Sequence, residues 1–143
     1  MRVLVADDDP VFRALVQRLL QEWRFDVVIA TDGAEAWEIL RRDDAPRLVL
    51  LDWMMPGMDG YEVCKMMRDL KGRKNLYVMM VTGGRKKDDI MKVVLAGADD
   101  YLIKPFDPVD LKIRLRNAMR VLHLQEDLDE LKRRRQGQTA KTA

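Results

Sequence analysis

The segment LVLLDWMMPGMDG (residues 48–60) opens with four consecutive apolar residues and reaches an aspartate, Asp52, directly after them. The apolar residues are continuous and do not alternate with polar ones, which is the pattern of a strand buried on both faces. Strands of this kind are typical of parallel sheets covered by helices on both sides. The segment therefore predicts an inner strand of a parallel sheet that ends at an acidic residue.

Four more short apolar runs occur, at residues 3–6, 27–30, 77–81 and 101–103. Between and after the runs, helical patterns cover residues 12–23, 34–40, 63–70, 90–97 and about 108–135. Asp9-Pro10 and Asp107-Pro108 each fit an N-cap aspartate followed by proline at the first helical position. The strict alternation predicts an α/β fold, a doubly wound parallel sheet of five strands with an extended C-terminal helix.

Polar residues follow four of the five predicted strands. Asp7 and Asp8 follow the first strand, Asp52 the third, Thr82 the fourth and Lys104 the fifth. In an open parallel sheet all strand carboxyl ends lie along one edge, and ligands bind where the strand order reverses. If the order is 2-1-3-4-5, residues some 100 positions apart in this chain converge on one pocket.

Such a pocket has a definite chemistry. Clustered carboxylates repel one another unless a cation lies among them, and oxygen ligands favour a hard ion such as Mg²⁺, with Mn²⁺ as an alternative. One carboxylate can act as a nucleophile toward phosphorus and form an aspartyl phosphate. A metal ion, Lys104 and Thr82 would supply the positive charge and the donors that the phosphoryl oxygens need.

Each of these residues has an ordinary structural interpretation when taken alone. Asp9 fits a helix N-cap, while Asp59 before Gly60 and the pair Asp99-Asp100 fit turns and caps. Thr82 could be a simple strand-end threonine and Lys104 a solvated lysine. Their joint placement at the ends of successive strands is what indicates a functional site.

Composition narrows the class of protein. Of the 143 residues, 48% are hydrophobic and 35% charged, which predicts one globular domain. A net charge of +2 gives no reason to expect nucleic-acid binding, and the basic run 132–135 fits a solvated helix end. A single cysteine, Cys64, excludes an intramolecular disulfide and fits a reducing compartment. No signal peptide or membrane span is visible, so we expect a cytoplasmic protein.

Four motifs, in order, resemble the receiver domains of bacterial response regulators. They are the acidic opening at residues 3–10, the segment 51–60 around Asp52, Val81-Thr82-Gly83, and the segment 96–106 that contains Lys104-Pro105. The resemblance covers about residues 2–122. It implies a flavodoxin-like fold with strand order 2-1-3-4-5 and a role in two-component signal transduction.

The resemblance also implies a role for each residue. Asp52 would accept a phosphoryl group from a phosphohistidine of a sensor histidine kinase or a phosphotransfer protein. Asp8, Asp52 and the backbone carbonyl of Met54 would ligate Mg²⁺ directly, and Asp7 mainly through water. Thr82 and Lys104 would bind the phosphoryl group, with Tyr101 rotating inward after Thr82 on activation. The bond between Lys104 and Pro105 would be cis.

Two features bear on the lifetime of a phosphorylated form. The position after Thr82 is commonly alanine in the family but is Gly83 here, which we expect to loosen the backbone and widen access to the site. The residues two places after Asp52 and after Thr82, which flank the path of the attacking water, are Met54 and Gly84. Neither side chain can orient that water, so we expect slow hydrolysis.

Two other functions remain as alternatives. An aspartate-nucleophile phosphatase of the haloacid dehalogenase type needs a second aspartate two residues after the nucleophile, and Met54 stands there. A phosphate-independent interaction scaffold would not need the complete acidic, threonine and lysine set. We therefore expect a switch and not an enzyme.

The C-terminal region divides into an extension of the last helix, residues 123–135, and a disordered tail, residues 136–143. The extension resembles connectors that lead from receivers into diguanylate cyclase or phosphatase domains. It also fits the start of a coiled coil, because four apolar residues follow 3-4-3 spacing: Val121, Leu124, Leu128 and Leu131. A homodimer through the fourth and fifth helices and this extension is one interpretation, and a lone solvated helix is the other.

Overall fold

The computed structural model describes residues 1–70, 75–83 and 87–142. In these residues strands and helices alternate strictly. The strands are β1 (Arg2–Ala6), β2 (Asp26–Ala30), β3 (Leu48–Asp52), β4 (Tyr77–Thr82) and β5 (Asp100–Ile103). The helices are α1 (Pro10–Glu22), α2 (Gly33–Leu40), α3 (Gly60–Arg68), α4 (Lys87–Leu95) and α5 (Pro108–Thr142).

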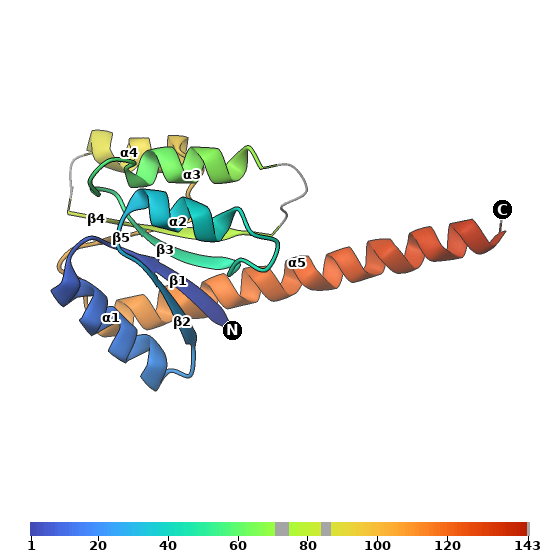
Figure 1. Ribbon diagram of the computed structural model, residues 1–143. Helices are drawn as coiled ribbons and strands as arrows, with labels where there is room; N and C mark the ends of the chain where they lie inside the picture. Colours follow the sequence, from blue (N-terminus) through green and yellow to red (C-terminus); the bar gives the residue numbers. More distant parts are fainter. Residues whose placement is uncertain (71–74, 84–86, 143) are drawn as a thin grey trace.

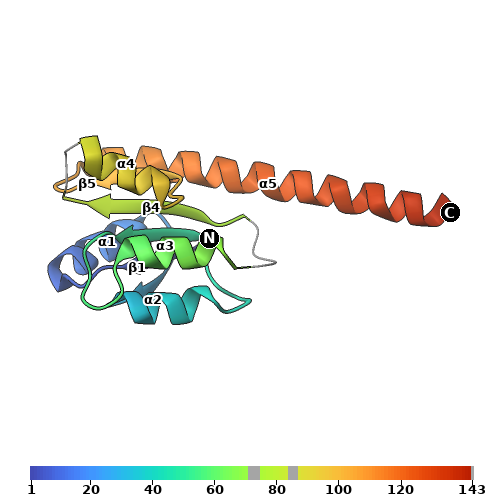
Figure 2. The same ribbon diagram turned by 90° about the horizontal axis from the view of Figure 1, so that it is seen from above.

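The five strands form one parallel sheet in the order β2-β1-β3-β4-β5, which confirms the predicted topology. Figures 1 and 2 show α1 and α5 on one face of the sheet and α2, α3 and α4 on the other. The flavodoxin-like α/β fold follows from the continuous apolar strands, because both faces need cover.

The apolar core has two parts, one on each face of the sheet. The central strands β3 and β4 are buried at every position, whereas β2 at the edge is only partly buried. Alternate residues of a strand point to opposite faces, so Leu50 packs toward α1 and α5, and Val49 and Leu51 pack toward the other three helices. The segment 48–60 therefore begins as an inner strand, as predicted.

Aspartates begin four of the five helices. Asp9, Asp32 and Asp59 are the N-caps of α1, α2 and α3, each accepting a backbone N–H of the first turn. Asp107 accepts the N–H of Val109 at 2.8 Å. The interpretation of Asp9 and Asp59 as caps is confirmed.

Three predicted helical patterns run past the helix ends that the structure has. Trp23 is the C-cap of α1, and Leu70 lies beyond α3. Gly97 lies beyond α4 with φ of +91°, a left-handed conformation that glycine adopts readily after a helix. Trp23 still packs against the core beyond the end of α1, so there the apolar spacing continues although the helix has ended.

The last helix is longer than predicted. We expected it to end near Arg135, with residues 136–143 disordered, but α5 runs from Pro108 to Thr142. Residues 136–142 contain no proline, and their Gln, Ala and Lys have high helix propensity, so the helix continues through Gly137 although glycine costs about 1 kcal/mol relative to alanine there. Figure 1 shows the second half of α5 projecting far beyond the sheet.

Two contacts with the rest of the domain hold α5 at the point where it extends beyond the sheet. Arg47, just before β3, forms an ion pair with Glu126 at 2.7 Å, and Asn75 donates to Asp129 at 2.5 Å. Past Glu126 the apolar residues Leu128 and Leu131 are 52% and 62% exposed. Within the described residues, no helix is long and apolar enough to cross a membrane.

Candidate functional site

The predicted polar residues meet at the carboxyl edge of the sheet. Asp7 and Asp8 follow β1, Asp52 ends β3, Thr82 ends β4 and Lys104 follows β5. The strands β1, β3, β4 and β5 are successive neighbours, so these ends lie side by side. Two backbone hydrogen bonds continue the ladder there, from Trp53 N–H to the carbonyl of Val81 and from Lys104 N–H to the carbonyl of Thr82.

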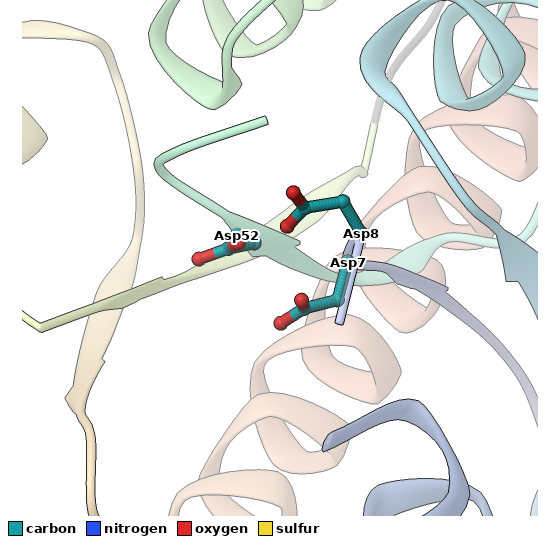
Figure 3. Close-up of side chains that lie close together, drawn as sticks. All are labelled: Asp7, Asp8 and Asp52. Carbon is teal, nitrogen blue, oxygen red and sulfur yellow. The ribbon is translucent and has the colours of Figure 1, made fainter. Parts of the chain in front are cut away.

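Three carboxylates form a cluster at this edge (Figure 3). Asp7, Asp8 and Asp52 each offer an oxygen, and these oxygens all lie within 4.8 Å of one another. Asp7 and Asp52 are buried, whereas Asp8 is exposed. Only oxygen ligands are present, and one side of the cluster is open to water, which fits a hard cation such as Mg²⁺ that keeps part of its hydration.

Lys104 is the positive charge of the cluster. Its ammonium donates to Asp7 Oδ2 at 2.8 Å and lies 3.6 Å from Asp52 Oδ1. Its bond to Pro105 is cis, as predicted. With three carboxylates and one ammonium, the cluster would carry a net charge of about −2 if all were ionised, which favours a divalent cation.

Phe12 is a site residue that sequence reasoning missed. Its ring centroid lies 4.0 Å from the Lys104 ammonium, and its edge meets the ring of Phe106 at 5.7 Å between centroids. The ring therefore stabilises the ammonium through a cation–π contact. The helical pattern 12–23 predicts Phe12 only as an apolar position of a helix. Its closeness in sequence to Asp7 and Asp8 is the signal that could have indicated a place in the site.

Asp7 is held in place by further contacts. Its Oδ1 accepts the N–H of Asp9 at 2.9 Å, and its backbone carbonyl accepts a hydrogen bond from Arg13 at 2.8 Å. Both carboxylate oxygens of Asp7 thus have protein donors, since Lys104 takes the other. Among the three carboxylates, Asp7 therefore has both oxygens engaged by protein donors.

The pKa of the Asp52 carboxyl is raised from its ordinary 3.8 to about 7. Burial is the largest cause and the charge of Asp7 the next; the Lys104 ammonium opposes both, and Asp8 adds a smaller increase. A cation bound at the cluster would offset these unfavourable effects and favour the ionised form, which is the nucleophilic one.

The close approach of two glycines fixes the segment around Asp52. A Cβ on Gly60 would lie 2.3 Å from the carbonyl oxygen of Asp52, and one on Gly33 would lie 1.8 Å from the carbonyl oxygen of Met58. Neither place has room for a side chain, so both positions require glycine. These contacts link the starts of α2 and α3 to the loop that carries Asp52.

The structure places the other predicted residues as follows. Thr82 is buried at the end of β4, next to β5. Tyr101 lies on β5, half-buried, with Arg114 5.6 Å from its ring. The Met54 side chain is 71% exposed. A Cβ on Gly83 would meet no atom within 4 Å, so space does not demand glycine there, and Gly84 lies outside the described residues.

A family model described as "Response regulator receiver domain" matches residues 3–116. The chain belongs to this family. It is a receiver domain of the kind found in two-component response regulators, and the five polar residues at the four strand ends lie inside the matched range.

Relatives and solved structures agree with this assignment. The receiver domain is 38% identical over 119 residues to the DNA-binding response regulator MtrA of Mycolicibacterium smegmatis, covering 83% of this chain and 50% of the relative. It is 32% identical over 120 residues to a CheY homologue, a chemotaxis protein, of Campylobacter jejuni, covering 83% and 92%. The chain spans about half the length of the first curated relatives it matches.

Among solved structures, the chain is similar to the receiver domain of a sensor histidine kinase from Pseudomonas aeruginosa PAO1, with 25% identity and a TM-score of 0.73. The alignment covers 85% of this chain and 97% of that one. That structure has a magnesium ion coordinated in its active-site cleft.

Proposed function

We propose that this receiver domain is a phosphorylation-activated switch whose phosphoacceptor is Asp52. The observation that carries the proposal is the convergence of Asp7, Asp8 and Asp52, with Lys104 2.8 Å from Asp7 and 3.6 Å from Asp52. A buried carboxylate beside an ammonium and two further carboxylates suits attack on phosphorus once a cation balances the charge. The magnesium-containing similar structure supports Mg²⁺ as that cation.

In this proposal the site residues divide the work among attack, metal binding and binding of the phosphoryl group. Asp52 attacks phosphorus through a carboxylate oxygen, and the bond from phosphorus to the donor breaks. Lys104 turns from Asp7 and Asp52 toward the new phosphoryl oxygens, to which Thr82 also donates. Asp8, Asp52 and the Met54 carbonyl would hold Mg²⁺, and the ion would supply positive charge for the phosphoryl group. Tyr101 follows Thr82 inward when the switch closes.

The donor in this proposal is a phosphohistidine of a sensor histidine kinase or phosphotransfer protein, and the location is cytoplasmic. Family membership supports both. Residues 1–122 form the receiver domain, and the rest of α5 carries its output. A phosphatase is less well supported, because Met54 stands where that chemistry needs an acid and its side chain is exposed.

The test is phosphorylation by acetyl phosphate with Mg²⁺. Asp52→Asn should abolish incorporation of the phosphoryl group, whereas Asp9→Asn, next to the site, should retain it, since asparagine also caps a helix. Circular dichroism would establish that both variants fold. Incorporation at full stoichiometry by Asp52→Asn would refute the assignment, and release of many product equivalents would favour the phosphatase.

We also propose that the chain forms a homodimer through the α5 extension. Four apolar side chains lie exposed on it at coiled-coil spacing: Val121, Leu124, Leu128 and Leu131. In that register Asp127 faces Lys132 of a parallel second helix, an attractive pair. Two heptads are short, so we propose that α4 and the start of α5 contribute and that phosphorylation strengthens pairing.

A further inference from the structure

A groove with an apolar floor lies between the end of α1 and the first half of α5. Its volume is about 530 Å³, within the usual range of about 300–1,000 Å³ for binding pockets. The floor includes Trp23 and Phe25 from the end of α1, and Ile113 and Met119 from α5. This face of the sheet is covered by two helices and the opposite face by three (Figures 1 and 2), which leaves the groove open to solvent.

The rim of the groove is basic. Arg24 lies on the α1 side, and Lys112, Arg116 and Arg120 follow at intervals of four residues along α5. All four are exposed, and among the described residues none has an acidic partner. No acidic residue lines the described part of the groove. Arg47, Arg68 and Arg114 are ion-paired elsewhere in the domain, whereas in this groove four cations without acidic partners in the described chain lie together.

The apolar and basic features occur together. Val109 and Ile113 in the groove are 62% and 54% exposed, and the Lys112 ammonium lies 5.7 Å from the Trp23 ring. Single exposed apolar residues are common, but here they share one groove with four unpaired cations. The lining along α5 extends from Val109 to His123, about 21 Å at a rise of about 1.5 Å per residue.

We propose that this groove binds an amphipathic helix of a partner protein, with acidic residues flanking its apolar face. Cations one turn apart on α5 match carboxylates one turn apart on a helix lying alongside, and apolar anchors in a hydrophobic groove are the usual mode of helix recognition. Nucleic acid would leave the apolar floor unused, since phosphate contacts are polar.

A second copy of this chain is a poorer occupant. Its exposed apolar helix, the α5 extension, carries four acidic residues between positions 126 and 130 but four basic ones at 132–135. Laid along the groove, those basic residues would meet the unpaired cations of the rim. The groove also runs away from Asp52 toward the opposite edge of the sheet, where α1 ends and β2 begins, so an occupant there need not cover the phosphoacceptor.

The experiment uses a displayed library of helical peptides of about 16 residues, roughly enough to span the groove. Leucines are fixed along one face, and each flanking position is free to be Glu, Gln or Lys. Selection on the full chain should enrich Glu at the flanking positions. For a selected peptide, Arg116→Glu combined with Arg120→Glu should raise the Kd at least about tenfold, and Ile113→Ser should raise it without changing the net charge.

The matched control is Arg133→Glu with Arg134→Glu, an equal charge change on the α5 extension, which should leave the Kd within about twofold. No enrichment of Glu, or an equal loss of affinity in the control, would overturn the proposal. It is also overturned if light scattering shows a dimer that the groove variant dissociates, or if only phosphatidylserine vesicles bind in a way that depends on Arg116 and Arg120. All the substituted charged positions are exposed, so we expect these variants to fold. Circular dichroism checks this.

Discussion

Replacing Asp52 with asparagine should stabilise the metal-free domain at neutral and alkaline pH. The folded pKa of Asp52 is about 7 and the ordinary value is 3.8, so between these pH values the folded state binds a proton that the unfolded chain does not. Stability therefore falls as pH rises from about 4 to about 7, and above about 7 the whole penalty is present. A difference of about 3 pKa units corresponds to about 4 kcal/mol.

Asparagine has nearly the same shape and cannot ionise, so the variant escapes this penalty. The linkage relation predicts that the free energy of unfolding of Asp52→Asn exceeds that of the unmutated domain by at most about 4 kcal/mol at pH 8 and about 2 kcal/mol at pH 5. This difference is called the gain below. The attraction between the ionised carboxylate and Lys104, 3.6 Å away, already contributes to the pKa of about 7, so it needs no separate allowance. The quantity to compare is the change in the gain between pH 5 and pH 8, about 2–3 kcal/mol, because effects that do not depend on pH cancel.

The assay is urea unfolding followed by circular dichroism, in chelator, at pH 5 and pH 8. The control is Asp43→Asn, an exposed aspartate in the loop before β3, for which the two gains should agree within about 0.5 kcal/mol. A gain for Asp52→Asn that is equal at both pH values, or larger at pH 5, would show that Asp52 is not held in an environment that disfavours its charge.

Three further results are expected. Millimolar Mg²⁺ should raise the melting temperature of the unmutated chain by mass action, and Asp8→Ala should remove most of that increase; an unchanged melting temperature across the titration would contradict the metal site. The phosphorylated form should persist for minutes or longer after the donor is removed, because Met54 and Gly84 cannot orient water, whereas loss of the phosphoryl group within seconds and without a phosphatase would contradict this. Light scattering with beryllofluoride, a stable phosphoryl mimic, should show a dimer that Leu128→Lys dissociates. A chain that stays monomeric at high micromolar concentration, or a dimer that Leu128→Lys leaves intact, would exclude pairing through the apolar residues of the α5 extension.

Much of the fold was predictable because its signals are local. Continuous apolar runs such as 48–51 indicate strands buried on both faces, and the aspartates at positions 9 and 59 indicate where helices begin. The site was predictable for a related reason, since parallel strands bring their carboxyl ends to one edge. Asp52 and Lys104 could thus be placed together although 51 residues of sequence lie between them.

Other features depend on distant contacts that no local pattern encodes. The support of Lys104 by Phe12 and the ion pair of Arg47 with Glu126, 79 positions apart, arise from packing. The need for glycine at position 60 comes from the Asp52 carbonyl behind it. The end of α5 was misplaced because a polar composition suggested disorder, whereas a helix that is already nucleated continues through residues 136–142, Gly137 included, without a new nucleation cost.

The anchoring of α5 near Glu126 makes the rest of the helix a lever with its fulcrum at the edge of the sheet. From Glu126 to Thr142 the helix is about 24 Å long, so a tilt of about 10° at the fulcrum moves its tip by about 4 Å. The two contacts that set the fulcrum come from the starts of β3 and β4, the same strands whose other ends carry Asp52 and Thr82. A shift of these strands by a fraction of an ångström would therefore be enlarged at the tip of α5.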